Sequence, residues 1–159
     1  MNDTIERSQT HATFVLERTY DAAVARVWHA LSDGAARAEW FTGGDDVTTT
    51  ESSHDFRVGG QTVDDGQWHG GPRSRFVATY TDIVEEQRIV YAYDMWLDGR
   101  HISTSIGTMA LQAQDDGTTR LTYTEQGVHL DGLDTPQQRE EGTAGLLDLL
   151  ASFLHGRTA

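Results

Sequence analysis

The sequence contains no cysteine, no lysine and only two prolines among its 159 residues. Without cysteine, the chain can form no disulfide, no thiol nucleophile and no cysteine-ligated zinc or iron–sulfur site. It also lacks any run close to the length of about 18 apolar residues that a membrane-spanning helix needs. All 12 basic residues are arginine and stand against 25 acidic ones, which gives a net charge of −13. This acidic excess argues against a nucleic-acid partner, because phosphate binding needs a basic face.

Two explanations fit the absence of lysine: codon usage in a GC-rich genome, and adaptation to high salt, in which an acidic surface stays soluble. Neither identifies a function. The first ten residues are polar and contain no apolar signal core, so we expect a cytoplasmic protein. We also expect residues 1–10 to form a flexible N-terminal arm and residues 11–156 to form a single domain.

Most of the chain alternates between turn signals and short segments rich in Val, Ile, Thr, Tyr and Phe. This pattern is typical of an antiparallel meander of hairpins. The clearest predicted strands are 76–84, 88–95, 101–113 and 119–128. In the second of these, every other residue from Ile89 to Met95 is apolar, which places one face of the strand in a core.

Helical spacing interrupts the strand pattern in two places. Near the N-terminus, Val24, Val27, Trp28 and Leu31 follow the spacing of an amphipathic helix, with Asp21 as its expected N-cap. A second short helix over about 35–40 is expected to follow it directly.

The last part of the chain predicts a longer helix that begins after Thr135. This threonine, Pro136 and Gln138 form the pattern of a capping box with proline at the first helical position. A broad apolar face follows, and Gly156 can end the helix. The apolar residues of that face are Leu146, Leu147, Leu149, Leu150, Phe153 and Leu154. A long amphipathic helix after an antiparallel sheet should lie across the sheet, and a cavity can form between them if the sheet curves.

Five segments, in this order and spacing, resemble a known family. They are FVLERTY at 14–20, WF at 40–41, FRVGG at 56–60, IVEEQRIVY at 83–91 and GTTRLTY at 117–123. Together with the first and final helices, they are similar to homologues of the heat-shock-protein-ninety ATPase activator, in the START-like (SRPBCC, birch-pollen-allergen-like) superfamily. The resemblance covers about residues 12–155.

The resemblance implies an α+β helix-grip fold. In this fold a curved antiparallel sheet wraps around a long C-terminal helix, and two short helices follow the first strand. It also implies an internal pocket for a hydrophobic small molecule. Lipid and hormone carriers, polyketide cyclases and many bacterial proteins share this fold, so the fold limits function only loosely. We expect a bacterial protein, as either a monomer or a homodimer.

The residues that we expect around such a ligand combine aromatic walls with a few polar groups. They are Trp40, Phe41, Tyr91, Tyr93, His101, Tyr123, Glu125 and Gly145.

The glycines and Glu125 leave alternatives open, while His101 has a single predicted orientation. Gly142 and Gly145 in the final helix mark either close packing on the sheet or room for a ligand. His101 shares its strand phase with Ser103 and Ser105, which predicts that it faces the pocket mouth. Glu125 is either solvated at a strand end or buried. A buried carboxylate needs a partner, for which Arg75, Arg88 and His129 are candidates.

No metal signature appears among the seven histidines, and we predict no metal, no cofactor and no catalytic residue. The first hypothesis for function is the binding of a lipid-like, aromatic or polyketide-like molecule. The second is a cyclase or hydrolase that uses Glu125 and His101 as acid and base in the same cavity. The third is an interaction module for a chaperone ATPase, following the family name.

Overall fold

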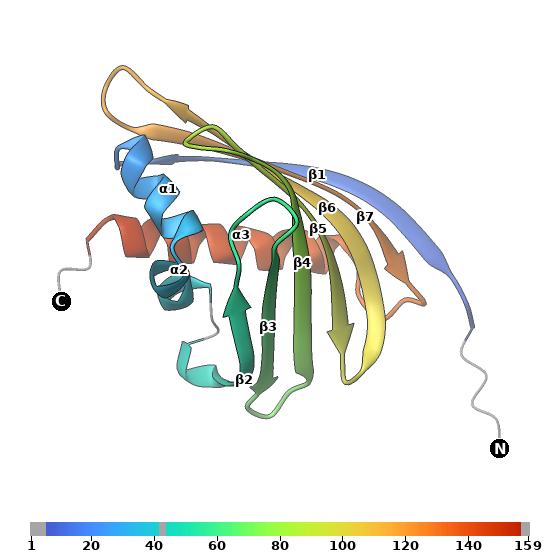
Figure 1. Ribbon diagram of the computed structural model, residues 1–159. Coiled ribbons are helices and arrows are strands. Elements are labelled where there is room, and N and C mark those ends of the chain that lie inside the picture. The colour runs from blue at the N-terminus through green and yellow to red at the C-terminus, as the bar shows by residue number, and fades with distance from the viewer. Residues whose placement is uncertain (1–5, 42–43, 157–159) are drawn as a thin grey trace.

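The computed structural model describes residues 6–41 and 44–156. Seven antiparallel strands form one curved sheet in the order β1-β7-β6-β5-β4-β3-β2. Three helices lie on its concave side (Figure 1). This is the α+β helix-grip architecture that the family resemblance implies.

The strands follow the predicted hairpins closely. They are β1 (Gln9–Tyr20), β2 (Val47–His54), β3 (Gln61–Trp68), β4 (Arg73–Val84), β5 (Arg88–Leu97), β6 (Arg100–Ala113) and β7 (Thr119–Leu130). β1 already begins at Gln9, so residues 9 and 10 of the expected arm lie in the sheet, while residues 1–5 of that arm lie outside the described residues. Asp98-Gly99 and Asp131-Gly132 have positive φ at both residues, as tight turns after strands require.

Two short helices, α1 (Val24–Ser32) and α2 (Gly34–Trp40), connect β1 to a 3-10 turn (Gly44–Asp46) that leads into β2. The N-cap of α1 is Ala23, so the prediction of Asp21 was wrong. The backbone N–H of Asp21 donates instead to His155 Nε2, beyond the end of the last helix, which keeps Asp21 outside α1.

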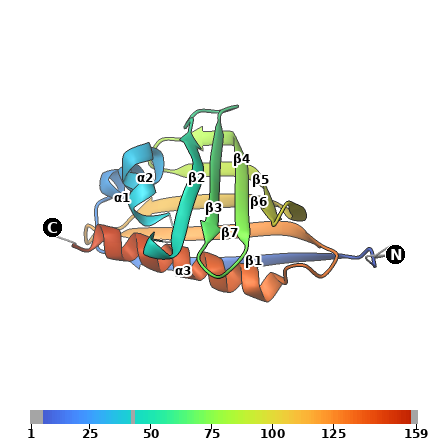
Figure 2. The same ribbon diagram turned by 90° about the horizontal axis from the view of Figure 1, so that it is seen from below.

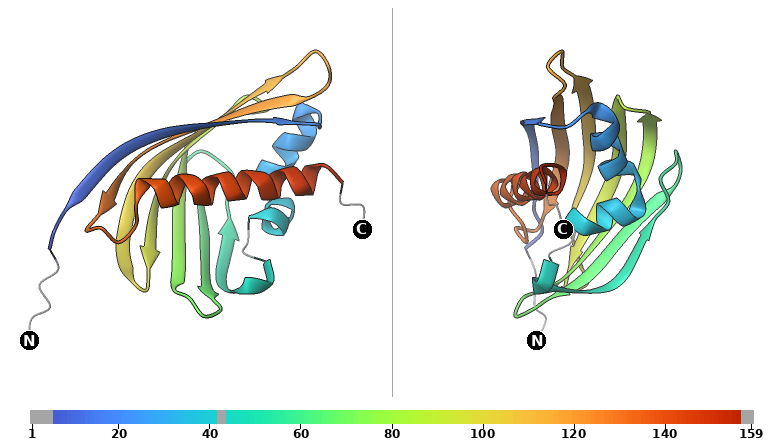
Figure 3. Two further views of the ribbon diagram at one scale, coloured as in Figure 1. Left: turned by 180° about the vertical axis from the view of Figure 1, so that it is seen from behind. Right: turned by 90° about the vertical axis from the view of Figure 1, so that its left-hand side faces the viewer.

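The long helix α3 (Pro136–Leu154) begins as the sequence predicted. Thr135 Oγ1 accepts from the N–H of Gln138, and the side chain of Gln138 accepts from the N–H of Thr135. These two bonds satisfy backbone donors that a bare helix start leaves without a partner. The helix then crosses the concave side of the sheet (Figure 3), and Figure 2 shows it running beside β1.

The core lies under the C-terminal half of α3. Leu147, Leu150 and Leu154 are buried at helical spacing, against α1 and the end of β1. Tyr20 closes this end by donating from its hydroxyl to the carbonyl of Leu147. The apolar face of α3 is narrower than the sequence predicted, because Leu149 is 45% exposed. Among residues 6–41 and 44–156, no helix is long and apolar enough to cross a membrane.

Candidate ligand-binding cavity

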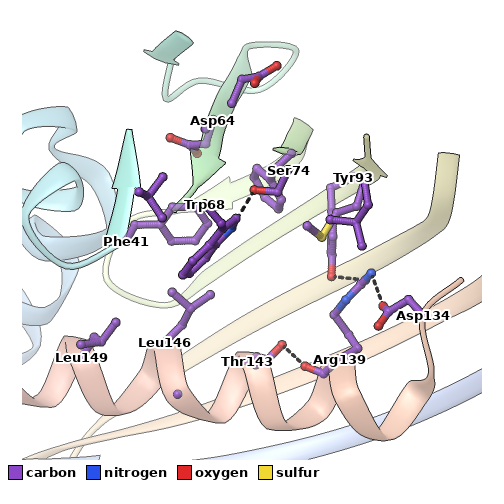
Figure 4. Close-up of a pocket in the computed structure, with 18 of the residues that line it drawn as sticks. Phe41, Asp64, Trp68, Ser74, Tyr93, Asp134, Arg139, Thr143, Leu146 and Leu149 are labelled. Atoms are coloured by element: carbon purple, nitrogen blue, oxygen red, sulfur yellow. Dashed lines mark hydrogen bonds and ion pairs between the residues drawn. The ribbon is translucent and has the colours of Figure 1, made fainter. Parts of the chain in front are cut away.

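A cavity of about 570 Å³ separates α3 from the concave face of the sheet. Strands β2 to β7, α2 and α3 all contribute to its wall. Figure 4 shows Leu146 and Leu149 of α3 opposite Trp68 and Phe41, with Arg139 reaching toward Tyr93. The wall is predominantly apolar and aromatic. Its apolar members include Trp40, Phe76, Met95, Leu97, Ile102 and Met109.

Glycines keep the helix side of the cavity open. Apart from its own stretch of the helix, a Cβ atom placed on Gly142 or Gly145 would meet no atom within 4 Å. Both residues line the cavity, so α3 does not pack closely on the sheet at these positions. Of the two alternatives for these glycines, the structure therefore favours open space over close packing.

A further glycine shapes the sheet side. Gly107 of β6 pairs with Tyr91 of β5 on one side and with Glu125 of β7 on the other. A Cβ atom at Gly107 would lie 2.7 Å from Tyr91 Cζ and 2.9 Å from Tyr123 Oη. Because those approaches are too close for a real side chain, Gly107 is what allows the two phenols to meet above the sheet.

A buried carboxylate organises these phenols. Glu125 is 2% exposed, and its Oε1 accepts hydrogen bonds from the hydroxyls of Tyr93 and Tyr123, each at 2.6 Å. Tyr91 donates to Tyr123 Oη at 3.0 Å. The cation beside Glu125 is Arg139, whose Nη1 lies 3.5 Å from Glu125 Oε2.

The proposed partners of Glu125 were therefore wrong. Arg75 pairs with Asp65 and Glu51, Arg88 pairs with Asp82, and His129 lies beside Asp134. The curvature of the sheet brings α3 over β7, so the partner comes from the helix, which strand periodicity cannot reveal.

Arg139 connects the helix to the sheet by several bonds. Its guanidinium donates to Tyr93 Oη at 2.9 Å, to Ser103 Oγ at 2.7 Å and to Asp134 Oδ2 at 2.9 Å. It is 8% exposed. A guanidinium with this many acceptors offsets part of the cost of burying it, and it holds the N-terminal part of α3 at the cavity.

Burial also sets the charge of the neighbouring groups. It raises the pKa of Tyr91, Tyr93 and Tyr123, so that all three phenols are neutral near pH 7. Burial, followed by the charge of Arg139, lowers the pKa of His129, which favours a neutral imidazole. Burial therefore leaves Arg139 as the cation of this cluster.

A second polar group lies at the other end of the cavity. Asp65 of β3 is 3% exposed and accepts from Arg73 at 2.7 Å and from Arg75 at 3.0 Å. The bond to Arg73 is the main reason that the pKa of Asp65 is well below its usual range. Asp64 forms an ion pair with Arg37 at 2.9 Å. Both residues are part of the cavity wall, but neighbouring residues of a strand point to opposite faces. Asp64 pairs across the strands with the cavity residue Phe76, whereas Asp65 pairs with Arg75 on the outer face.

Six of the eight residues expected around a ligand line the cavity: Trp40, Phe41, Tyr91, Tyr93, Tyr123 and Gly145. Glu125 lies behind the phenols and is outside the wall itself.

The structure places His101 away from the cavity, on the outer face of the sheet. A β-bulge shifts the register between Met95 and Trp96, so that Ile102 and Ser103 are both buried. Ile102 is the extra residue of β6 at this bulge, so His101 points to the opposite face from the one that its spacing from Ser103 predicts. The ring of His101 therefore contacts Asp94 and Thr104 on the outer face.

Arg139 and Asp134 are functional residues that were not predicted from the sequence. A signal for Arg139 was present, because Arg139, Gly142, Thr143 and Leu146 share one helical face by their spacing of three, four and seven residues. A charged residue on the face that carries Gly142 is a candidate for a buried group. No group of three His, Asp or Glu side chains is placed to hold a metal ion in residues 6–41 and 44–156.

Together, an open antiparallel sheet, a helix across it and a cavity between them define a helix-grip domain. The family model described as "Activator of Hsp90 ATPase homolog 1-like protein" matches residues 21–155. The chain therefore belongs to this family.

Solved structures of bacterial proteins agree with this assignment. The Mll3558 protein from Rhizobium loti is 46% identical, with a TM-score of 0.85, and the match covers 92% of this chain and 99% of that one. A protein from Rhizobium leguminosarum is 39% identical, with a TM-score of 0.88 over 94% and 98% of the two chains. The AHSA1-like protein from Aeromonas hydrophila is 22% identical, with a TM-score of 0.67 over 91% and 92%, and shares the fold. No curated protein matches the sequence.

Proposed function

We propose that this protein binds a small hydrophobic molecule in the cavity between the sheet and α3. The observation that carries the proposal is the cavity of about 570 Å³, which two glycines of α3 keep open. Small-molecule sites are usually concave, mostly apolar and roughly 300–1,000 Å³ in volume. The cavity has these properties.

The physical basis of binding is the burial of apolar surface. Each 100 Å² of apolar ligand surface removed from water contributes roughly 2.5 kcal/mol. Empty space beside apolar walls also forfeits dispersion contacts that a ligand restores. An aromatic ligand fits the flat side chains of Phe41, Phe76 and Trp68 around the cavity.

Two measurements test this proposal. Native mass spectrometry of freshly purified protein should reveal a retained small molecule, and its mass identifies the ligand class. After removal of that molecule, the uncharged dye Nile red should bind one to one and fluoresce more strongly. A protein that carries no molecule and does not bind Nile red would contradict the proposal.

The hypothesis of a cyclase or hydrolase with Glu125 and His101 as acid and base is the weaker one. Its two residues, Glu125 and His101, lie on opposite sides of the sheet, so they cannot act together on one substrate. A chaperone interaction remains the second candidate, and the family match over residues 21–155 is the observation that favours it. Stimulation of a cognate chaperone ATPase by the purified protein, undiminished when the cavity is filled, would support that role instead.

A further inference from the structure

Among residues 6–41 and 44–156, each arginine that faces the cavity already pairs with a carboxylate, so none is free for an acidic ligand. Two carboxylates and one guanidinium face the cavity, those of Asp64, Asp134 and Arg139, while the carboxylate of Asp65 lies on the outer face of the sheet. Each wall carboxylate already has an arginine partner, as described above. The guanidinium of Arg139 is shared between Asp134 and Glu125.

The other arginines near the cavity are engaged as well. Arg37 pairs with Asp64, while Arg73 and Arg75 lie on the outer face of the sheet, where both pair with Asp65. The chain has no lysine that could supply a further cation. An anionic head group that entered the cavity would lose its hydration and meet an excess of carboxylates, both of which oppose binding.

The direction of the hydrogen bonds adds a second constraint. Each phenol has one proton, and Tyr93 and Tyr123 give theirs to Glu125. The proton between Tyr91 and Tyr123 must then come from Tyr91. All three phenol protons therefore point along the chain that ends at Glu125, and only oxygen lone pairs remain for a ligand.

Tyr91 is the phenol with the greatest remaining capacity to accept. Tyr93 Oη already accepts from Arg139, and Tyr123 Oη accepts from Tyr91. Among residues 6–41 and 44–156, no group donates to Tyr91 Oη, and this tyrosine is part of the cavity wall. A ligand group that satisfies this oxygen has to be a hydrogen-bond donor.

We infer that the cavity selects an uncharged, largely apolar ligand with a hydroxyl group that donates to the phenol cluster, and that it rejects carboxylates. The inference rests on the proposed function and adds the chemical class of the ligand. A hydroxyl fits because it supplies the missing donor without a charge. A cation would have to be desolvated beside carboxylates that are already paired, so it gains less.

Three naphthalene compounds of nearly equal size test the inference: 2-naphthol, 2-methoxynaphthalene and 2-naphthoate. The first can donate a hydrogen bond, the second can only accept one, and the third is anionic at neutral pH. Each is titrated against the protein with Nile red bound, and the displacement gives its Kd. We expect 2-naphthol to bind about fivefold to tenfold more tightly than 2-methoxynaphthalene, and 2-naphthoate to bind roughly a hundredfold more weakly than 2-methoxynaphthalene.

Tyr91→Phe removes the proposed acceptor and should bring the naphthol-to-ether ratio close to one. Tyr80→Phe is the matched control, because Tyr80 Oη bonds to Thr62 outside the main cavity, and this variant should keep the preference. The ratio is taken within one protein, so a change in stability does not alter it.

The outcomes separate the two proposals. If Nile red does not bind, the proposed function fails, and the inference fails with it. If Nile red binds but the ether matches 2-naphthol, or 2-naphthoate binds as tightly as either, the function stands and the inference is overturned. The inference is also overturned if none of the three compounds displaces the dye, or if Tyr91→Phe keeps the full preference.

Discussion

Replacing Gly145 with leucine should separate ligand binding from stability. A glycine inside a helix costs up to about 1 kcal/mol relative to a good helix former, so Gly145→Leu should stabilise α3 by roughly 0.8 kcal/mol. Apart from the helix's own backbone, no atom lies within 4 Å of a Cβ placed at this position, so the new side chain meets open space. For a chain of this length, that gain corresponds to an increase in Tm of roughly 2–3 °C.

Binding should change in the opposite direction. The leucine extends into the cavity that Gly145 lines and occupies volume that the ligand needs. A ligand that loses about 100 Å² of apolar contact loses roughly 2.5 kcal/mol, or about 70-fold in Kd. Circular dichroism during heating measures Tm, and titration with Nile red measures Kd.

The matched control places the same side chain elsewhere on α3. Ser152 is exposed and does not line the cavity, so Ser152→Leu should leave the Kd for Nile red within about twofold. Unchanged binding in folded Gly145→Leu protein would refute the cavity as the binding site. A fall in Tm of several degrees would refute the statement that the space beside Gly145 is open.

Three further predictions concern the polar cluster and its supports. Arg139→Met leaves Glu125 buried without its cation, so it should lower the free energy of unfolding, measured in urea, by about 3–5 kcal/mol. Adding Glu125→Gln to that variant should recover part of the loss, and fully additive losses would contradict the coupling of the two residues. Gly107→Ala should lower the free energy of unfolding by about 1–3 kcal/mol, because its Cβ would lie 2.7 Å from Tyr91 Cζ. A variant as stable as the unaltered protein would refute this tight contact. Burial lowers the pKa of His129 in the folded state, so the unfolded state binds a proton more readily. The stabilising contribution of neutral His129 should therefore be fully present above about pH 6.5, and it should be lost as the pH falls below that value. His129→Gln should make this pH dependence shallower without abolishing it, since the pKa of His54 is also lowered, and an unchanged pH profile would count against the role of His129.

Elements held by local interactions could be predicted from sequence. The capping box at Thr135 and Gln138 joins residues three apart, and the pattern of α1 repeats within eight residues. The hairpins of β4 to β7 are set by turn residues between adjacent strands. In each case the interacting groups are close in the chain, so a short stretch of sequence contains the cause of the structure.

Which polar residues face the cavity could not be predicted in the same way. His101 has the strand phase of an inward residue, but one bulge near Ile102 turns it outward. A bulge depends on how two strands meet, and the sequence of one strand does not reveal it. Aromatic residues such as Tyr91 and Tyr93 were easier to place, because the register between β5 and β6 is unbroken up to Met95 and period-two alternation therefore holds there.

The sequence by itself determined the fold class, the strands and helices, and the absence of cysteine and lysine chemistry. It also indicated that the C-terminal helix carries two unusual glycines, at positions 142 and 145. Only the tertiary structure decided that these glycines face open space, and that Glu125 of β7 meets Arg139 of α3. The physical reason is that the curvature and register of a whole sheet set such contacts, and these properties arise from interactions between residues far apart in the chain.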